Sequence, residues 1–168
     1  MADQGPQFPL YIPSKGRSEY MITSKYLTYM GVRHNVVVEP SQMDDYRNAI
    51  KSMNLLATAV ELDLSYKEKY ELCDNHGLTK STGPGPARNF ASKSNGYDWH
   101  WVMDDNIRSF RRLNKNEKVK VINGSIFKAM EDFCLRYENI SMAGPNYFMF
   151  ASARSKTKPF ITNTRIYS

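Results

Sequence analysis

The chain has 168 residues, of which 41% are hydrophobic and 24% charged, and this excludes a disordered tail or a fibre. It contains no apolar run near the roughly 20 residues that a transmembrane helix needs. Its N-terminus lacks the basic and apolar regions of a secretory signal, so we expect a soluble protein of the cytoplasm, with no membrane partner. The formal net charge of +6 favours an anionic partner, either a phosphate-bearing small molecule or nucleic acid.

Hydrophobic periodicity predicts alternating strands and helices along the chain. In the first half we expect strands over 8–12 and 32–39, and helices over 19–30 and 40–53. The pattern over 55–64 is ambiguous and is interpreted as a strand followed by a turn. The apolar stripe of the first helix contains Ile22, Tyr26, Tyr29 and Met30, and that of the second contains Met43, Tyr46, Ile50 and Met53. Ser41 is expected to cap the second helix.

In the second half, Pro86 suits the first turn of a helix that runs to about Ser94. Strands are expected over 98–103, 118–122, 140–150 and 160–167, with a helix over 125–137. The order of elements predicts a single α/β domain over residues 1–168, with helices on both faces of a sheet. Ligands of such sheets bind outside the carboxyl ends of the strands.

The loop after the first strand reads Pro13-Ser14-Lys15-Gly16-Arg17. Its two cations, hydroxyl and glycine suit a diphosphate and the base or ribose beside it. The chain has neither a P-loop nor a GxGxxG motif, which argues against an ATPase and a dinucleotide oxidoreductase. An ordinary basic turn between strand and helix is the alternative interpretation.

Asp104-Asp105-Asn106 follows the apolar strand near Met103. Three oxygen-bearing side chains near a core need compensation, and a hard cation such as Mn²⁺ or Mg²⁺ would supply it. These residue types also favour plain turns, so a turn without metal is the alternative. The next segment, 108–120, holds six basic residues and one acid; it is either a surface for nucleic acid or a solvated hairpin.

In combination, the segments 85–91 and 95–106 resemble the core of GT-A glycosyltransferases, in which an Ala-Arg-Asn helix precedes an apolar strand and an Asp-x-Asp motif. Asn106 departs from that motif, although some GT-A enzymes carry Asp-Asp-Asn. The chain is more closely similar to the TET-associated glycosyltransferases of bacteriophages. The matching stretches, which occur in order over nearly the whole chain, are 11–17, 37–40, 86–89, 101–107, 112–114, 131–133, 136–139, 143–147 and 163–165.

The resemblance implies a Rossmann-like GT-A fold and transfer of a sugar from a nucleotide donor, taken here as a UDP-sugar, to hydroxymethylated pyrimidines such as hydroxymethylcytosine in phage DNA. It makes Asp104 and Asp105 the catalytic residues, with Asp104, Asp105 and Asn106 holding Mn²⁺ or Mg²⁺. Asp105 would contact the cation directly. The residues implied at the donor are Pro13, Ser14, Lys15, Arg17, Glu39 and Arg88. The alternatives are an ordinary acid at a helix start for Glu39 and a structural ion pair for Arg88.

Two other functions remain open from the sequence: a sugar nucleotidyltransferase, and a non-catalytic module that binds nucleotide or DNA. Family chains continue beyond a segment like Asn163–Tyr167, whereas this one stops at Ser168, with no Asp or Glu after Glu138. We therefore expect the acceptor-side part to be absent, and the chain to bind a donor but to transfer sugar poorly.

Overall fold

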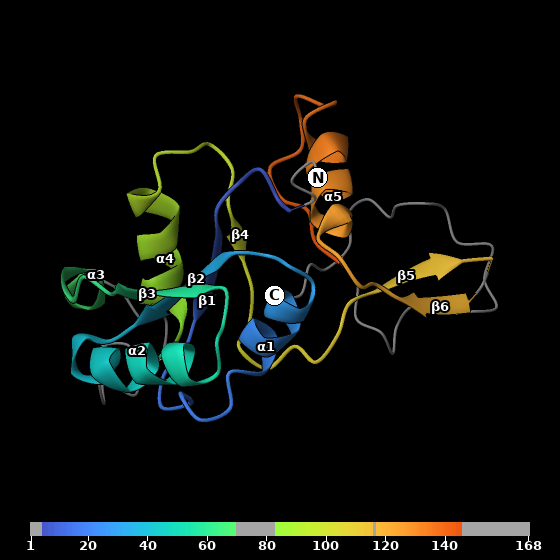
Figure 1. The fold of residues 1–168 in the computed structure, drawn as a ribbon. Coiled ribbons are helices and arrows are strands. Elements are labelled where there is room, and N and C mark those ends of the chain that lie inside the picture. Colours follow the sequence, from blue (N-terminus) through green and yellow to red (C-terminus); the bar gives the residue numbers. More distant parts are fainter. Residues whose placement is uncertain (1–4, 70–82, 116, 146–168) are drawn as a thin grey trace.

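The computed structural model describes residues 5–69, 83–115 and 117–145. Its centre is a four-stranded sheet in the order β3-β2-β1-β4, in which every pairing is parallel (Figure 1). The strands are β1 (Leu10–Pro13), β2 (His34–Val38), β3 (Ala57–Glu61) and β4 (Trp101–Val102). An antiparallel pair, β5 (Arg111–Asn114) and β6 (Glu117–Lys120), forms a separate ribbon that projects from the body of the molecule.

Helices cover both faces of the sheet, which confirms the α/β class predicted from the sequence. They are α1 (Ile22–Tyr29), α2 (Met43–Ser52), α3 (Ser65–Glu68), α4 (Gly85–Ser94) and α5 (Ser125–Cys134), with a 3-10 turn η1 (Pro40–Gln42) before α2. Because side chains alternate along a strand, Leu10 and Ile12 pack in one cluster with α1 and α5, whereas Tyr11 packs with α4 on the other face.

Several helices and strands begin or end at other residues than the sequence predicts. Ser41 does not cap α2: it lies within η1, and Gln42 precedes the helix without a side-chain cap. The first helix begins at Ile22, because Met21 adopts a left-handed backbone (φ 38°). Residues 140–145 carry no regular structure, and the rest of the two last predicted strands lies outside the described residues.

Two of the predicted apolar stripes are partly wrong. Tyr29 is 61% exposed, and the buried face of α1 is formed by Thr23, Ser24, Tyr26 and Leu27. In α5 the buried residues are Phe127, Glu131 and Cys134, instead of the expected 126, 130, 133 and 137. The stripe of α2 is confirmed at Met43 and Tyr46, its two fully buried members.

The buried carboxylate of Glu131 explains why α5 turns this face inward. It accepts hydrogen bonds from the backbone N–H groups of Gln7 (2.8 Å) and Phe8 (3.2 Å) and from the indole of Trp101 (2.7 Å). A charge can be buried at low cost only when such partners are present. Glu131 thereby joins α5 to the entry of β1 and to β4. Among the described residues, no helix is long and apolar enough to cross a membrane.

The buried histidine of β2 predicts a loss of stability in acid. His34 is 4% exposed, and burial lowers the pKa of its ring below the ordinary 6.5, although a bond to the Val32 carbonyl opposes this. The unfolded chain therefore binds the proton more readily, and stability should decrease as pH falls below about 6.5. Urea unfolding between pH 5.5 and 8 should show this slope, and His34→Gln should flatten it.

Burial also lowers the pKa of His100, so His100→Gln serves as the comparison. His34 is far more completely buried, and its Nε2 contacts no hydrogen-bond partner within the described residues. The larger flattening should therefore come from His34→Gln. An unchanged slope in that variant would contradict the assignment.

Candidate active site

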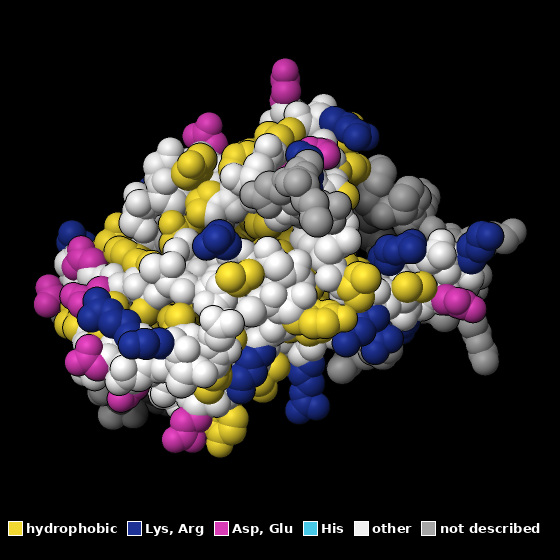
Figure 2. All heavy atoms as spheres, viewed as in Figure 1, with side chains coloured by type: hydrophobic (Ala, Val, Ile, Leu, Met, Phe, Trp, Pro, Cys, Tyr) yellow, Lys and Arg dark blue, Asp and Glu magenta, His cyan; other side chains and the backbone are white. Residues whose placement is uncertain are grey.

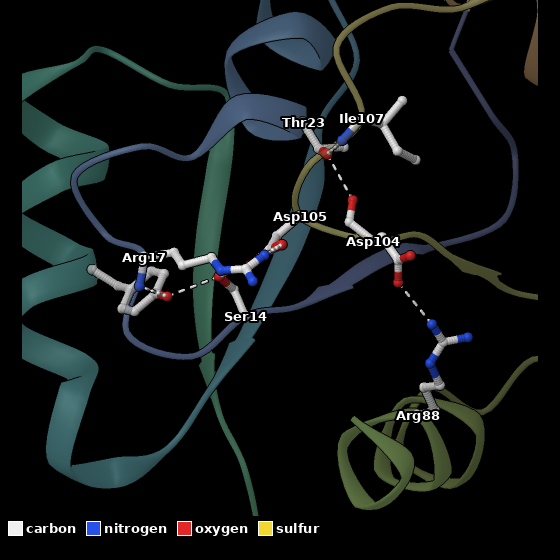
Figure 3. A network of polar contacts seen from close by, with 8 residues as sticks. Ser14, Arg17, Thr23, Arg88, Asp104, Asp105 and Ile107 are labelled. Atoms are coloured by element: carbon white, nitrogen blue, oxygen red, sulfur yellow. Dashed lines mark hydrogen bonds and ion pairs between the residues drawn. The ribbon is translucent and has the colours of Figure 1, made fainter. Parts of the chain in front are cut away.

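The carboxyl ends of the parallel strands bring the predicted loops together at one edge of the sheet (Figure 3). Ser14 and Arg17 follow β1, Glu39 follows β2, and Asp104 and Asp105 follow β4. Arg88 reaches the same edge from α4, where it contacts Asp104. The structure thus unites loops that are separated by up to about ninety positions in the sequence, as the rule for ligand binding in such sheets predicts.

The acidic turn is held by the first turn of α1. The buried Thr23 hydroxyl donates to the Asp104 carbonyl (2.6 Å) and accepts the Ile107 N–H (2.8 Å). The Thr23 N–H, one of the unpaired donors of a helix start, donates to the Asp105 carbonyl (3.2 Å). The helix and the turn therefore complete each other's backbone hydrogen bonds, and the position of both carboxylates depends on this junction.

Both oxygens of the Asp105 carboxylate are engaged by the loop after β1. Arg17 Nη1 lies 2.6 Å from Oδ1, and the Ser14 hydroxyl donates to Oδ2 at 2.8 Å. Ser14 Oγ also lies 2.8 Å from the hydroxyl of Tyr46, which accepts the Arg17 N–H (3.0 Å). Because an amide only donates and a carboxylate only accepts, these hydrogen bonds run in one direction. The Arg17 amide donates to the Tyr46 hydroxyl, Tyr46 donates to Ser14, and Ser14 donates to Asp105.

The two neighbouring carboxylates point to different cations (Figure 3). Arg88 Nη2 donates to Asp104 Oδ1 at 2.8 Å, on the α4 side, while Asp105 faces Arg17. Burial raises the pKa of Asp104 above its ordinary value, the Arg88 guanidinium opposes this, and the Asp105 carboxylate adds to it. Pointing the two acids apart and giving each an arginine limits their mutual repulsion.

Glu39 forms ion pairs with two lysines. Lys15 Nζ lies 2.8 Å from its Oε1, and Lys67 Nζ contacts the same oxygen. Hydrogen bonds from Lys15 and then Lys67 lower the pKa of the Glu39 carboxyl, so it is ionised at neutral pH. The loop after β1 is therefore held on both sides, through Lys15 by the acid after β2 and through Arg17 by the acid after β4.

Backbone contacts give the same loop a defined shape. Pro13 ends β1 half-buried, and the Ser14 N–H donates to the Val37 carbonyl of β2 (3.0 Å). Gly16 has a φ of +64°, which other residues adopt only with strain, and its N–H donates to the side chain of Gln42 (3.0 Å). The loop thus presents Lys15 and Arg17, both exposed, from a fixed main chain.

The acidic turn supplies some, but not all, of the oxygen ligands that a hard divalent cation requires. Asp104 and Asp105 offer carboxylate oxygens, and Asn106 follows them in an exposed position. Within the described ranges, no three His, Cys, Asp or Glu side chains gather as a metal cluster. A cation here would therefore need further oxygen ligands such as phosphate and water, which is the usual arrangement for Mg²⁺ at nucleotide sites.

Beyond the acidic turn, the chain enters the basic ribbon, β5 and β6 with the residues that flank them. Phe110 anchors its base: it is buried, with ring centroids 6.1 Å from Tyr26 and 5.2 Å from Phe127. The Tyr26 hydroxyl donates to the Val121 carbonyl at the other end (2.6 Å). Lys and Arg side chains gather over the ribbon at the right of Figure 2. The predicted hairpin is present, rooted in the core.

Three residues of the site were not predicted from the sequence. Thr23 lies where a helix was expected but in no motif, and Lys67 lies in a short helix, α3, that was not predicted. Tyr46 was predicted as a core residue, and it is indeed 1% exposed. The one available signal was its hydroxyl, because a tyrosine on an otherwise apolar helix face needs a polar partner.

Replacing Thr23 tests the junction between α1 and the acidic turn. Thr23→Val keeps the shape but leaves the Ile107 N–H and the Asp104 carbonyl without this partner, which should destabilise the protein by about 1–3 kcal/mol. It should also weaken binding of an anionic ligand at the site, as measured by calorimetry with UDP.

The matched control is Thr28→Val in the same helix. The Thr28 hydroxyl accepts the Leu56 N–H (3.0 Å), a contact to the segment before β3 and outside the acidic turn. Both variants should lose stability in urea, but only Thr23→Val should lose ligand affinity. Equal losses of affinity would mean that the junction has no special role.

Comparison with known proteins adds one finding. A family model described as TET-Associated Glycosyltransferase matches residues 8–168. A search of curated proteins found no match, and a search of solved structures found none. The matched range contains every site residue described above and decides between the enzyme classes that the sequence left open. The chain belongs to the TET-associated glycosyltransferase family, and its α/β fold is that of a Rossmann-like glycosyltransferase.

Proposed function

We propose that the protein transfers a sugar from a UDP-sugar to the hydroxyl of a hydroxymethylated pyrimidine in DNA, with Mn²⁺ or Mg²⁺ at the acidic turn. The observation that carries this proposal is the convergence of Asp104 and Asp105 with Arg17 and Arg88 at the carboxyl edge of the sheet, in a chain of a glycosyltransferase family. Such an edge offers both charges that a nucleotide diphosphate and its cation require.

In the proposed reaction the acceptor oxygen bonds to the anomeric carbon as the bond from that carbon to the diphosphate oxygen breaks. The acceptor's proton passes to a base or to water, and the nucleoside diphosphate leaves. Lys15 and Arg17 lie on the loop that would face the diphosphate, and both are exposed. Glu39, ionised at the end of β2, would accept hydrogen bonds from the base or ribose.

The cation would be held by Asp105, with Asp104 and Asn106 beside it, and its remaining ligands would come from the donor and from water. When bound, it neutralises negative charge on the leaving diphosphate. Arg88, 2.8 Å from Asp104, would orient that carboxylate and face the sugar or a phosphate. The acidic turn needs no rearrangement of its backbone for this, because Thr23 already holds it.

The basic ribbon supports a nucleic-acid acceptor. It starts a few residues after Asp105, so a strand bound along it would lie beside the donor site. Arg111, Arg112 and Lys115 are exposed on it. Lys120 stacks over the rings of Tyr26 (5.2 Å) and Tyr29 (5.4 Å), which keeps that charge at the surface near α1. Phosphate groups are the natural partners of such a surface.

Removing the two carboxylates tests the donor site. Asp104→Asn/Asp105→Asn should abolish Mn²⁺-dependent UDP binding in calorimetry. The circular dichroism spectrum should stay unchanged, because both residues lie in the turn after β4 and belong to no hydrophobic core cluster. The control is Asp44→Asn/Asp45→Asn, the same change in an adjacent, exposed pair at the start of α2. Undiminished binding in the first variant would refute the assignment.

Neutralising part of the ribbon tests the acceptor surface. Arg112→Gln/Lys115→Gln should weaken duplex DNA binding and reduce the slope of log affinity against log salt by up to about 1.8, because each phosphate contact contributes about 0.9. UDP affinity should not change. Arg47→Gln/Lys51→Gln on α2, which lies at the opposite end of the molecule from the ribbon (Figure 1), is the control. If Arg112→Gln/Lys115→Gln does not change DNA binding, the ribbon is a solvated hairpin and not an acceptor surface.

The reaction itself is tested by incubating the chain with Mn²⁺, hydroxymethylcytosine DNA and, in turn, UDP-glucose, UDP-GlcNAc and UDP-GalNAc. Mass spectrometry of the nucleosides should show a hexose or N-acetylhexosamine on hydroxymethylcytosine, in the low yield that the poor transfer expected from the sequence implies. Cytosine DNA, which lacks the acceptor hydroxyl, should stay unmodified. Equal modification of cytosine DNA would refute the hydroxymethyl acceptor and leave the donor site standing.

A further inference from the structure

We propose that Arg17 serves as an internal cation on Asp105 and exchanges this carboxylate for the donor's diphosphate when donor and metal bind. The inference rests on the donor and metal sites of the proposed function. It makes Arg17 a positioning residue that keeps the acidic turn neutral and closed before the donor arrives, and that couples the binding of metal to the binding of donor.

The starting point is that both oxygens of the Asp105 carboxylate already accept a hydrogen bond in this conformation. Arg17 lies 2.6 Å from Oδ1 and Ser14 occupies Oδ2. The Asp105 side chain is 13% exposed, so the approach of a hydrated cation is also restricted by its surroundings. A divalent cation on either oxygen would lie within a few ångströms of the Arg17 guanidinium, and like charges so close repel strongly when partly shielded from water. The guanidinium must therefore leave before or as the cation binds.

The main chain of Arg17 can stay while its side chain moves. Its N–H donates to the buried Tyr46 hydroxyl (3.0 Å), and its carbonyl accepts the N–H groups of Tyr20 (3.0 Å) and Met21 (3.3 Å). The side chain itself is 55% exposed, so solvent leaves it room to change rotamer once its ion pair with Asp105 breaks. A released guanidinium remains tethered to the loop that carries Lys15, next to the acidic turn. There it would meet the anionic group of the donor, the diphosphate, which an arginine can bind in bidentate fashion.

The exchange has a thermodynamic consequence. When metal binds without donor, it must break the ion pair between Arg17 and Asp105, and the arginine gains no new anionic partner. With donor present, the arginine gains the diphosphate as the metal gains the carboxylate. Each ligand therefore raises the affinity for the other, and the size of that effect is the same in both directions. Without Arg17, the carboxylate is already open and this part of the coupling disappears.

The test is calorimetric titration of Mn²⁺ into the protein, alone and with saturating UDP, for the wild type and Arg17→Gln. Arg17→Gln should bind Mn²⁺ alone more tightly, and the gain in Mn²⁺ affinity caused by UDP should fall by roughly 5-fold or more, within the usual range of such couplings. Arg17→Lys, which keeps a point charge, should lie between the two. Arg47→Gln, the same change in the exposed ion pair with Asp44, should behave as the wild type.

The outcomes separate this proposal from the function on which it rests. If Arg17→Gln binds Mn²⁺ alone no more tightly than the wild type, while Asp105→Asn still abolishes binding with UDP, the exchange is wrong and the metal site stands. If neither wild type nor variant binds Mn²⁺ with UDP present, the metal site fails and the exchange fails with it. If Arg17→Gln loses its circular dichroism signal, Arg17→Lys decides, because tighter binding of Mn²⁺ alone is expected of it as well.

Discussion

The junction between Thr23 and the acidic turn is the contact on which the site depends. One hydroxyl and one amide at the start of α1 hold the backbone on both sides of Asp104 and Asp105. One turn further along the same helix, Tyr26 holds the end of the basic ribbon through Val121. Residues three apart share a helix face, so α1 aligns the acidic turn and the ribbon as one unit. The proposed donor and acceptor sides are thereby set relative to each other by a single helix.

Charge pairing is the second constraint, because three acids lie along one sheet edge. Each of them has a cation from another element: Glu39 has Lys15 and Lys67, Asp104 has Arg88, and Asp105 has Arg17. The pairs neutralise the acids along this edge, and they hold in place the charged groups that the proposed donor and metal would use. In the proposed exchange at Arg17, binding replaces one partner by another within a prepared site, which demands less reorganisation than assembling one.

Much of the fold and the centre of the site followed from local pattern. The strands end where polar motifs begin, at Ser14, at Glu39 and at Asp104, and parallel strands place such ends at one edge. Pro86 was predicted in the first turn of α4, and the structure has it there. Such features depend on a few consecutive residues and on period, so they can be read from the chain alone. The family resemblance rested on the same motifs, and the matching family model confirms it.

The tertiary structure decided which side chains form hydrogen bonds and ion pairs with one another. That Tyr46 reaches Asp105 through Ser14, and that Lys67 joins Glu39, depends on how α2 and α3 pack against the strand ends. The inward faces of α1 and α5 were misjudged for the same reason, since a buried threonine or glutamate is stabilised only by groups distant in sequence. The sequence by itself determined which side chains end each strand; the packing of helices determined which of them meet, because hydrogen bonds and ion pairs form between neighbours in space.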